Sequence, residues 1–349
     1  MKHRIAYIEL DTHAEVLNQF YELTAASDVL EVDFYVSPKI KSLLGNSLQQ
    51  VNVVEPHQLL EAIKQQSYEL IILGTVHRYF STFLKVVKNF KSAIVVHNVN
   101  FSETPKHRLL NLIFKDDFVF RTKLLLKEGL LLSPDVYQLA SFLLVLDQNM
   151  TSENRRHLPL YYMKKKSDVK NAVPKMVIPG AVSQKRRDYD KVIAMLQHVE
   201  KPLEVYFLGK AQGAELEKIK SFVRSKKVFL KVHYYNQKLS QNDFQHLLSE
   251  ADILWCPIQT ETSFFSQTEI YGKTKSSGNI GDAITFGKLA VFPPEYAGKL
   301  PFVISETSDF IEDIEDIVRS KPYNFEQDYS FEIVKNQLEN VVLEMIRSN

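Results

Sequence analysis

The sequence is short of several features that would have assigned a class of protein at once. Its 349 residues include a single cysteine, Cys256, which excludes an internal disulfide framework and a cysteine-cluster zinc site. It contains no G-x-G-x-x-G and no G-x-x-x-x-G-K-[ST]. H-E-x-x-H and G-x-S-x-G are missing too. A typical dinucleotide-binding domain, a P-loop NTPase, a zincin and an α/β-hydrolase are therefore not indicated.

Long apolar runs are also missing. No window reaches the ~18 continuous apolar residues of a membrane span. At the N-terminus, Glu9 and Asp11 interrupt the chain before an apolar run long enough for a signal peptide. We therefore expect a cytoplasmic protein. The formal net charge of +1 gives no reason to expect a nucleic acid partner.

The second half of the chain has a regular rhythm of short apolar runs and amphipathic segments. The runs that predict strands are 175–180, 203–209, 228–235, 252–258, 289–294 and 302–305. The segments that predict helices are 189–199, 213–224, 240–250 and 278–286, and Ser240 with Asp243 forms a capping box at the third. Apolar strands that alternate with helices predict a parallel sheet covered on both faces. Residues 236–242 and 259–271 read as irregular loops.

The first half repeats this rhythm, so we predict an α/β protein of two Rossmann-like doubly wound domains that face a cleft. The expected strands are 4–10, 30–36, 51–54, 69–74, 92–98 and 142–148, with helices at 57–66 and 79–90 among them. The charged segment 164–175 is the expected boundary, as a solvated linker. The predicted domains are 1–168 and 169–325, followed by a helical segment, 326–349, that packs back on the first domain.

Glycine is scarce, yet it gathers in one place. Of the 11 glycines, four lie in "YGKTKSSGNIGDAITFGK", residues 271–288. A helix that begins near Gly278 would present unpaired N–H groups and its positive dipole end to an anion. The candidate binding residues here are Lys273, Thr274, Ser276, Ser277, Gly278, Asn279 and Asp282. The alternative is a flexible loop with solvated lysines, in which Asp282 is only a favourable acid in the first turn.

A second candidate stretch, "IPGAVSQKRRDYDKV" (178–192), follows the first strand of the same predicted domain. Gly180 ends that strand, and Ser183, Lys185, Arg186 and Arg187 follow in the loop, where they could hold a diphosphate. Three consecutive cations in a loop can also be merely solvated. The D-x-D pair of Asp188 and Asp190 opens a helix, where it complements the dipole, so we assign no metal to it.

These stretches in order resemble the donor domain of GT-B glycosyltransferases, most like family 4. The counterparts are "IPGAVSQKRRDY", "VYFLGKAQGAELEKI", "LLSEADILWCPI" and "GDAITFGKLAVFP", which together cover about residues 175–295. By this resemblance Arg186 falls near the family's diphosphate-binding cation, and Asp282 falls on the second acid of its E-x7-E motif, which holds the ribose. Thr274 stands where that motif has its first acid, and Ala181 stands where an arginine is usual.

The resemblance implies transfer of a sugar from a nucleoside diphosphate, of UDP or GDP type, to a hydroxyl of a glycan or glycolipid. It implies no cofactor and no metal. Two alternatives remain open. The chain could be a nucleotide-sugar epimerase of the same fold, or a degenerate domain without catalysis that binds a partner transferase.

Candidates for the acceptor side lie in the first half, after predicted strands. Asp11 and His13 follow the first strand, where either could orient an acceptor hydroxyl or act as a base if the enzyme inverts. His77, His97 and Asn98 follow later strands of the same sheet edge. The same residues would also be explained by an aspartate that caps a helix and by histidines that have no catalytic role.

Residues 106–132 mix cations with leucine and phenylalanine. They could rest on anionic lipid, which would place the protein peripherally at the inner membrane face. Helices that pack on the core explain the same composition, and both interpretations stay open.

Overall fold

The computed structural model describes residues 2–45, 48, 50–164, 171–296, 300–320 and 323–348. The chain divides into two compact units. The first comprises Met1–Leu160, Ser263–Ser276 and Phe331–Asn349, and the second comprises Tyr161–Thr262 and Ser277–Ser330. The predicted boundary between residues 168 and 169 falls within 165–170, which lie outside the described residues.

The first unit is built on a parallel sheet of seven strands in the order β3-β2-β1-β4-β5-β6-β7. The strands are β1 (His3–Glu9), β2 (Leu30–Val36), β3 (Asn52–Val53), β4 (Leu70–Leu73), β5 (Ser92–Val95), β6 (Phe142–Val145) and β7 (Arg155–His157). The order of the first six is that of a Rossmann fold. The strand predictions for this half are therefore confirmed.

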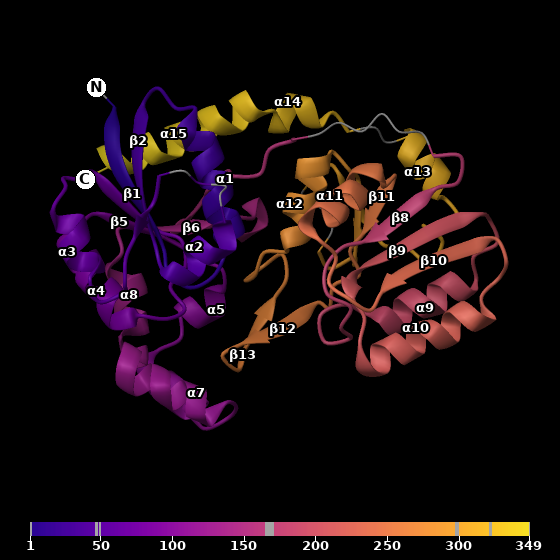
Figure 1. Ribbon diagram of the computed structural model, residues 1–349, viewed down its shortest axis with the longest axis horizontal. Helices are drawn as coiled ribbons and strands as arrows, with labels where there is room; N and C mark the ends of the chain where they lie inside the picture. The colour runs from indigo at the N-terminus through magenta and orange to yellow at the C-terminus, as the bar shows by residue number, and fades with distance from the viewer. Residues whose placement is uncertain are drawn as a thin grey trace. The chain divides into compact units, whose positions relative to one another are not determined.

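Helices cover both faces of this sheet (Figure 1). They are α1 (Ala14–Ala25), α2 (Pro38–Leu44), α3 (Leu59–Lys64), α4 (Phe80–Asn89), α5 (Val99–Ser102), α6 (Lys106–Ile113), α7 (Phe118–Lys123), α8 (Ser133–Leu139) and α15 (Phe331–Arg347), with short helical turns η1 (Leu124–Glu128), η2 (Leu130–Leu132) and η3 (Gln148–Met150). The side chains of strand β1 show why helices must cover both faces of the sheet. Ile8 belongs to a core with α3, α4 and α8, whereas Tyr7 points the other way and packs 4.7 Å from Phe20 of α1.

Two segments from late in the sequence, Ser263–Ser276 and Phe331–Asn349, also belong to the first unit. Helix α15 packs against α1 and buries Val334, Leu338, Val342 and Met345, the 3–4 spaced stripe of an amphipathic helix. Strands β12 (Glu261–Phe264) and β13 (Gln267–Ile270) form a hairpin in a region that we expected to be irregular. Its two turn residues, Phe265 and Ser266, have φ of 52° and 56°, as a tight two-residue turn requires.

The second unit repeats the architecture with a parallel sheet in the order β10-β9-β8-β11-β14-β15. Its strands are β8 (Lys175–Ile178), β9 (Leu203–Lys210), β10 (Leu230–Tyr235), β11 (Ile253–Trp255), β14 (Ala290–Phe292) and β15 (Val303–Ser305). Its helices are α9 (Tyr189–Gln197), α10 (Gly213–Ser225), α11 (Gln241–Glu250), α12 (Gly278–Phe286), α13 (Ile314–Ser320) and α14 (Phe325–Tyr329). Figure 1 shows α9 and α10 on one side of the sheet and α11 and α12 on the other. Two Rossmann-like units are thus confirmed.

The glycines of α12 serve different purposes. At Gly281 an added Cβ would lie 2.4 Å from the ring of Tyr161, so the helix can pack there only without a side chain. At Gly278, the first residue of the helix, an added Cβ would meet nothing within 4 Å. Gly281 therefore serves the packing of α12, and Gly278 stands at an open end of it.

This contrast gives a stability prediction. Gly281→Ala should lower the free energy of unfolding by about 1–2 kcal/mol, because the Tyr161 ring must move. Gly278→Ala is the matched control and should leave stability unchanged or slightly higher, since alanine favours helix. Chemical denaturation of both variants tests this. Equal stability of the two variants would contradict the packing role of Gly281.

Candidate functional site

Both sheets reverse their strand order at a single point. In the first unit β1 lies between β2 and β4, and in the second β8 lies between β9 and β11. Open α/β sheets bind ligands beyond the carboxyl ends of the strands at such a point. The candidate ligand-binding segments are therefore those that follow β1 and β4 in the first unit, and β8 and β11 in the second.

In the second unit, the loop after β8 is organised around Arg187. Gly180 has φ of 95°, and a Cβ there would lie 2.1 Å from Nη2 of Arg187. Only glycine therefore lets the guanidinium cross the end of the strand. Arg187 is 9% exposed, and its Nη1 donates to the carbonyl of Ala181 at 3.3 Å.

Arg187 also connects this loop to the start of α12. Its Nη2 donates to Oδ1 of Asn279 at 3.1 Å, and Nδ2 of Asn279 donates to Oδ2 of Asp282 at 3.0 Å. Burial raises the pKa of Asp282 to about 6, although the bond from Asn279 and the charge of Arg187 oppose that shift. Nε of Arg187 has no hydrogen-bond partner among the described residues. The loop and the helix start are thus held together by a buried cation.

The first turn of α12 has the features of an anion site. Ser277 caps the helix, and its Oγ accepts from the N–H of Asn279 at 3.3 Å. Gly278 is exposed, and the first N–H groups of a helix have no intrahelical acceptor. The dipole of the nine-residue helix adds positive potential at this end.

The other predicted residues of the β8 loop lie at its surface. The carbonyl of Ser183 accepts from the N–H groups of Arg186 and Arg187 at 3.0 and 2.9 Å, and this closes a turn. The side chains of Lys185 and Arg186 are exposed. Sequence analysis placed both arginines in this loop but selected only Arg186 as a site residue. The burial of one arginine in a run of three cations has no sequence signal except its place next to the helix cap.

Asp188 and Asp190 act on helix α9 and its neighbour. Oδ1 of Asp188 accepts from the N–H of Lys191 at 3.1 Å as the cap of α9. Asp190 lies in the first turn and pairs with Lys218. This agrees with the interpretation of the D-x-D pair as acids that open a helix.

In the first unit, the segment after β1 is organised by the buried carboxylate of Glu9, which sequence analysis did not select. Oε1 of Glu9 accepts from the N–H groups of Asp11 and Thr12 at 3.2 and 3.3 Å, and Oε2 accepts from the hydroxyl of Thr75 at 2.7 Å. Burial raises the pKa of Glu9 to about 7 against these hydrogen bonds. The signal that could have found it is a lone acid at the end of an apolar strand.

This turn holds His13 in an uncommon backbone conformation. His13 caps α1 with φ of 60° and ψ of 38°, the left-handed region, which marks functional positions when a non-glycine residue adopts it. Its side chain is 33% exposed. Nδ1 of His13 lies 2.9 Å from a carboxylate oxygen of Glu15. If Nδ1 carries the proton and donates to Glu15, Nε2 is left to accept one.

The ring of His13 stacks on His97 with 3.9 Å between centroids. His97 is buried, and its Nε2 donates to the carbonyl of Gly74 at 2.8 Å. Burial, followed by the charges of His13 and His77, lowers the pKa of His97 well below its ordinary value. A neutral His97 therefore supports the His13 ring without competing for a proton.

His77 and Asn98 complete this cluster. Nδ2 of Asn98 donates to Nε2 of His77 at 3.1 Å, and Nζ of Lys275 donates to Oδ1 of Asn98 at 2.5 Å. Burial, with smaller effects of His13 and Lys275, lowers the pKa of His77 to about 3. The structure therefore brings the predicted residues His13, His77, His97 and Asn98 together, and it adds Lys275.

Asp11 does not share that environment. Its carboxylate lies 2.9 Å from Nζ of Lys39 and 3.5 Å from Nη1 of Arg78. Both contacts are ion pairs, so the carboxylate of Asp11 is already engaged by two cations. Of the two residues that we proposed after β1, His13 is better placed to act as a base.

The predicted residues 273–276 belong to the first unit instead of the unit that contains α12. Oγ1 of Thr274 accepts from the N–H of Ile270 at 2.8 Å, and its carbonyl accepts from the N–H of Val99 at 2.9 Å. Lys273 is exposed, and Ser276 is half-buried. The physical reason is the hairpin. The buried Glu269 accepts from the N–H groups of Asn100 and Phe101 at 3.3 and 2.9 Å and so fixes this segment to α5.

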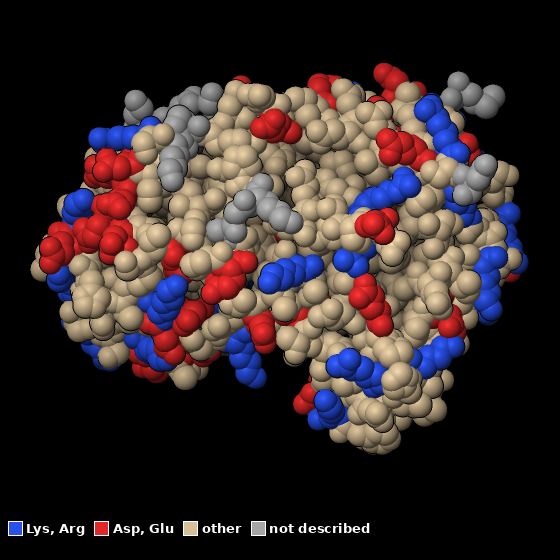
Figure 2. All heavy atoms as spheres, turned by 180° about the vertical axis from the view of Figure 1, so that it is seen from behind, with Lys and Arg blue, Asp and Glu red and all other residues tan. Residues whose placement is uncertain are grey.

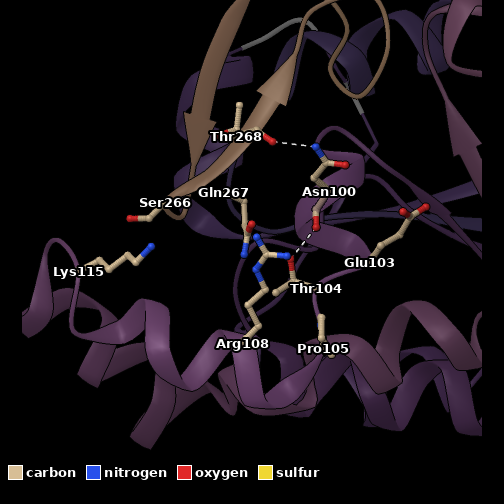
Figure 3. Close-up of a pocket in the computed structure, with 9 residues that line it drawn as sticks. All are labelled: Asn100, Glu103, Thr104, Pro105, Arg108, Lys115, Ser266, Gln267 and Thr268. Atoms are coloured by element: carbon tan, nitrogen blue, oxygen red, sulfur yellow. Dashed lines mark hydrogen bonds between the residues drawn. The ribbon is translucent and has the colours of Figure 1, made fainter.

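A polar pocket of about 540 Å³ opens in the first unit between α5, α6 and the hairpin. Figure 3 shows Arg108 extending from α6 toward the hairpin, where Gln267 lies. Lys115 and Ser266 also line the pocket, and Glu103 is the one acid among the described residues that line it. Two cations with amides and hydroxyls suit a hydroxylated or anionic group. No sequence pattern indicated this pocket.

Comparison with solved structures places these units in a known fold. The chain is similar to Anabaena HepE in complex with UDP (TM-score 0.60, 12% identity, 99% of this chain and 100% of that one). It is similar to the lipopolysaccharide outer core galactosyltransferase WaaB (TM-score 0.59, 10% identity, 98% and 99%). A putative UDP-N-acetylglucosamine 2-epimerase from Listeria monocytogenes also matches (TM-score 0.56, 9% identity, 100% and 98%). The fold is therefore GT-B.

No family model matches the sequence, and no curated protein matches it. Identities this low show the fold alone.

The buried carboxylate gives a prediction about pH. Between pH 4.5 and 7 the folded chain keeps the Glu9 proton that the unfolded chain has lost, so Glu9 makes the fold less stable as the pH rises through this range. Relative to Glu9→Gln, the wild type should gain up to about 3 kcal/mol as the pH falls across it. Denaturation at several pH values measures the difference.

The exposed Glu61→Gln is the matched control, because it removes a carboxylate that is not buried. A difference between wild type and Glu9→Gln that stays constant from pH 4.5 to 7 would show that burial does not raise the pKa of Glu9.

Proposed function

We propose that the protein is a glycosyltransferase that moves a sugar from a nucleoside diphosphate to a hydroxyl of a glycan or glycolipid. The observation that carries the proposal is the buried guanidinium of Arg187, which joins the loop after β8 to the first turn of α12 at the reversal point of the second sheet. A cation, the exposed first residue of a helix and a nearby carboxylate match a nucleoside diphosphate. A nucleotide is bound in the structure of HepE, which shares the fold.

In this proposal the diphosphate contacts the N–H of Gly278 at the start of α12. The loop after β8 approaches the diphosphate with Ser183, Lys185 and Arg186. The buried Arg187 adds positive charge to the site. Asp282 accepts hydrogen bonds from the ribose diol. These cationic and N–H donors stabilise the charge that the leaving diphosphate acquires, so the step needs no metal.

The histidine cluster of the first unit supplies the acceptor side. Nε2 of His13 takes the proton of the acceptor hydroxyl, with Nδ1 oriented by Glu15. The hydroxyl oxygen bonds to the anomeric carbon as the bond from that carbon to the diphosphate oxygen breaks, and the electron pair leaves with the diphosphate. His97 supports the ring of His13, and His77 with Asn98 completes the cluster around that ring. Direct displacement of this kind inverts the anomeric carbon.

The epimerase remains a second candidate because an epimerase shares the fold. Epimerisation needs acid and base groups on the donor sugar but no acceptor. Incubation of a UDP-sugar without acceptor separates the two: a new nucleotide-sugar epimer would favour the epimerase. Absence of both turnover and nucleotide binding would favour a degenerate domain that binds a partner transferase.

The donor site is tested first by Arg186→Ala. Its side chain is exposed, so thermal stability should change little while transfer from the donor falls at least about tenfold. A thermal-shift panel of UDP, GDP and ADP selects the nucleotide, and a turnover assay with the matching sugar gives the rate. Lys201→Ala, an exposed cation elsewhere in the second unit, is the control. Wild-type turnover in Arg186→Ala would remove this residue from the site.

The acceptor side is tested by His13→Gln. Loss of the base should lower kcat by about a hundredfold or more, while affinity for the nucleotide stays unchanged. Turnover and calorimetry on the same preparation give the two values. His57→Gln, an exposed histidine of the same unit, is the control. A fall in nucleotide affinity with unchanged kcat would contradict the role of His13.

A further inference from the structure

Apolar side chains are exposed mainly in one segment of the first unit. Six of the eleven large hydrophobic side chains exposed in the described part of the chain lie between residues 110 and 126. They are Leu110, Phe114, Phe118, Val119, Phe120 and Leu126. We call the segment 106–128, which contains α6, α7 and η1, the α6–α7 lobe. Figure 1 shows α7 standing away from the sheet of this unit. Clustered exposure of this kind marks a contact surface.

The lobe is anchored on its inner side, so its exposed side chains are not frayed ends. Leu109, Leu112 and Leu124 are buried in the core of the unit. Arg121 is buried as well: it donates to the carbonyl of Leu112 and, at 2.8 Å, to Oγ of Ser266 in the hairpin turn. Phe114 and Phe118 stack on the outer side with 5.7 Å between ring centroids. One side of the lobe packs on the protein, and the other presents apolar rings.

The charges of the lobe are divided in the same way. Asp116 lies 3.7 Å from Arg121, and Glu128 is hydrogen-bonded to Arg78 at 3.1 Å, so both acids are engaged. Four cations of the lobe make no ion pair among the described residues: Arg108, Lys115, Lys123 and Lys127. Among the acids of the lobe, only Asp117 makes no such pair. Figure 2 shows this lobe at the lower right as a largely tan surface with blue cations and little red. Its outer surface is apolar and basic.

We infer that the α6–α7 lobe docks on an anionic lipid bilayer, with Phe114, Val119 and Leu126 entering the interface and the lysines meeting lipid phosphates. Apolar side chains beside lysines are the combination that binds anionic membrane surfaces. Protein interfaces instead favour arginine and deplete lysine, and three of the four unpaired cations here are lysines. The lobe lies on the membrane and does not cross it, because no helix of the described residues is long and apolar enough to span a bilayer.

The polar pocket shown in Figure 3 shares residues with this lobe. Arg108 and Lys115 belong both to the lobe and to the lining of the pocket. A lipid phosphate held by the lobe would therefore have cationic partners continuing into a site of about 540 Å³. The docking inference uses only the exposure and charge of the lobe, so it stands apart from the proposed glycosyl transfer.

The experiment is co-sedimentation of the full chain with vesicles, without nucleotide. The wild type should bind vesicles of equimolar phosphatidylcholine and phosphatidylglycerol, bind pure phosphatidylcholine at least about tenfold less, and lose affinity as salt is raised. The apolar variant Phe114→Ser/Val119→Ser/Leu126→Ser changes side chains that are 73, 67 and 78% exposed, so it should fold normally and lose at least about tenfold in partitioning. The charge variant Lys115→Gln/Lys123→Gln/Lys127→Gln should lose a similar factor.

Matched controls remove the same chemistry elsewhere. Leu43→Ser/Val53→Ser/Val228→Ser removes three other exposed apolar side chains, and Lys85→Gln/Lys88→Gln/Lys238→Gln removes three other exposed lysines. Both should bind within about twofold of the wild type. Wild-type binding by either lobe variant, or equal binding of neutral and anionic vesicles, would overturn the inference. So would self-association through the lobe without vesicle binding, because that outcome would assign the surface to a protein partner.

Discussion

The contact between Arg187 and Asn279 is the interaction on which the candidate donor site depends. It crosses from the loop after β8 to the first turn of α12, and it can form only because Gly180 leaves the space that a Cβ would occupy. A buried guanidinium needs acceptors, and Asn279 and the Ala181 carbonyl supply two of them. The loop that carries Ser183, Lys185 and Arg186 is therefore positioned by an arginine that sequence reasoning did not select. Polar recognition of a diphosphate would rest on that buried cation.

The two units share one topology but hold different side chains at their strand ends. Both sheets reverse their order at the first strand of the unit, and each reversal point collects polar groups. In the second unit these are positive groups and helical N–H donors. In the first they are the stacked rings of His13 and His97 and the carboxylate of Glu9, whose pKa burial raises to about 7. The proposal therefore places donor binding in the second unit and proton transfer in the first, on the basis of what each strand end holds.

The sequence predicted most of the fold because apolar runs and helical periodicity are local. The strand runs, the start of α12 at Gly278 and the Ser240 cap, which accepts from the N–H of Asp243 at 3.1 Å, follow from neighbouring residues. The hairpin β12–β13 does not follow from neighbouring residues. Its polar segment is held in place by the non-local hydrogen bonds of Glu269 to α5. For the same reason local patterns preferred Arg186 to Arg187 and overlooked Glu9. Burial of a charge is decided by distant parts of the chain. The histidines that were predicted after separate strands do lie together, because parallel strands end at one edge of a sheet.

The most direct test of the account is a structure of the protein with UDP or GDP bound, whichever the chain takes up. In that structure the diphosphate should lie against the N–H of Gly278, with the β8 loop around it and the ribose within hydrogen-bond distance of Asp282. A nucleotide seated elsewhere, or none bound at millimolar concentration, would contradict the assignment of this site.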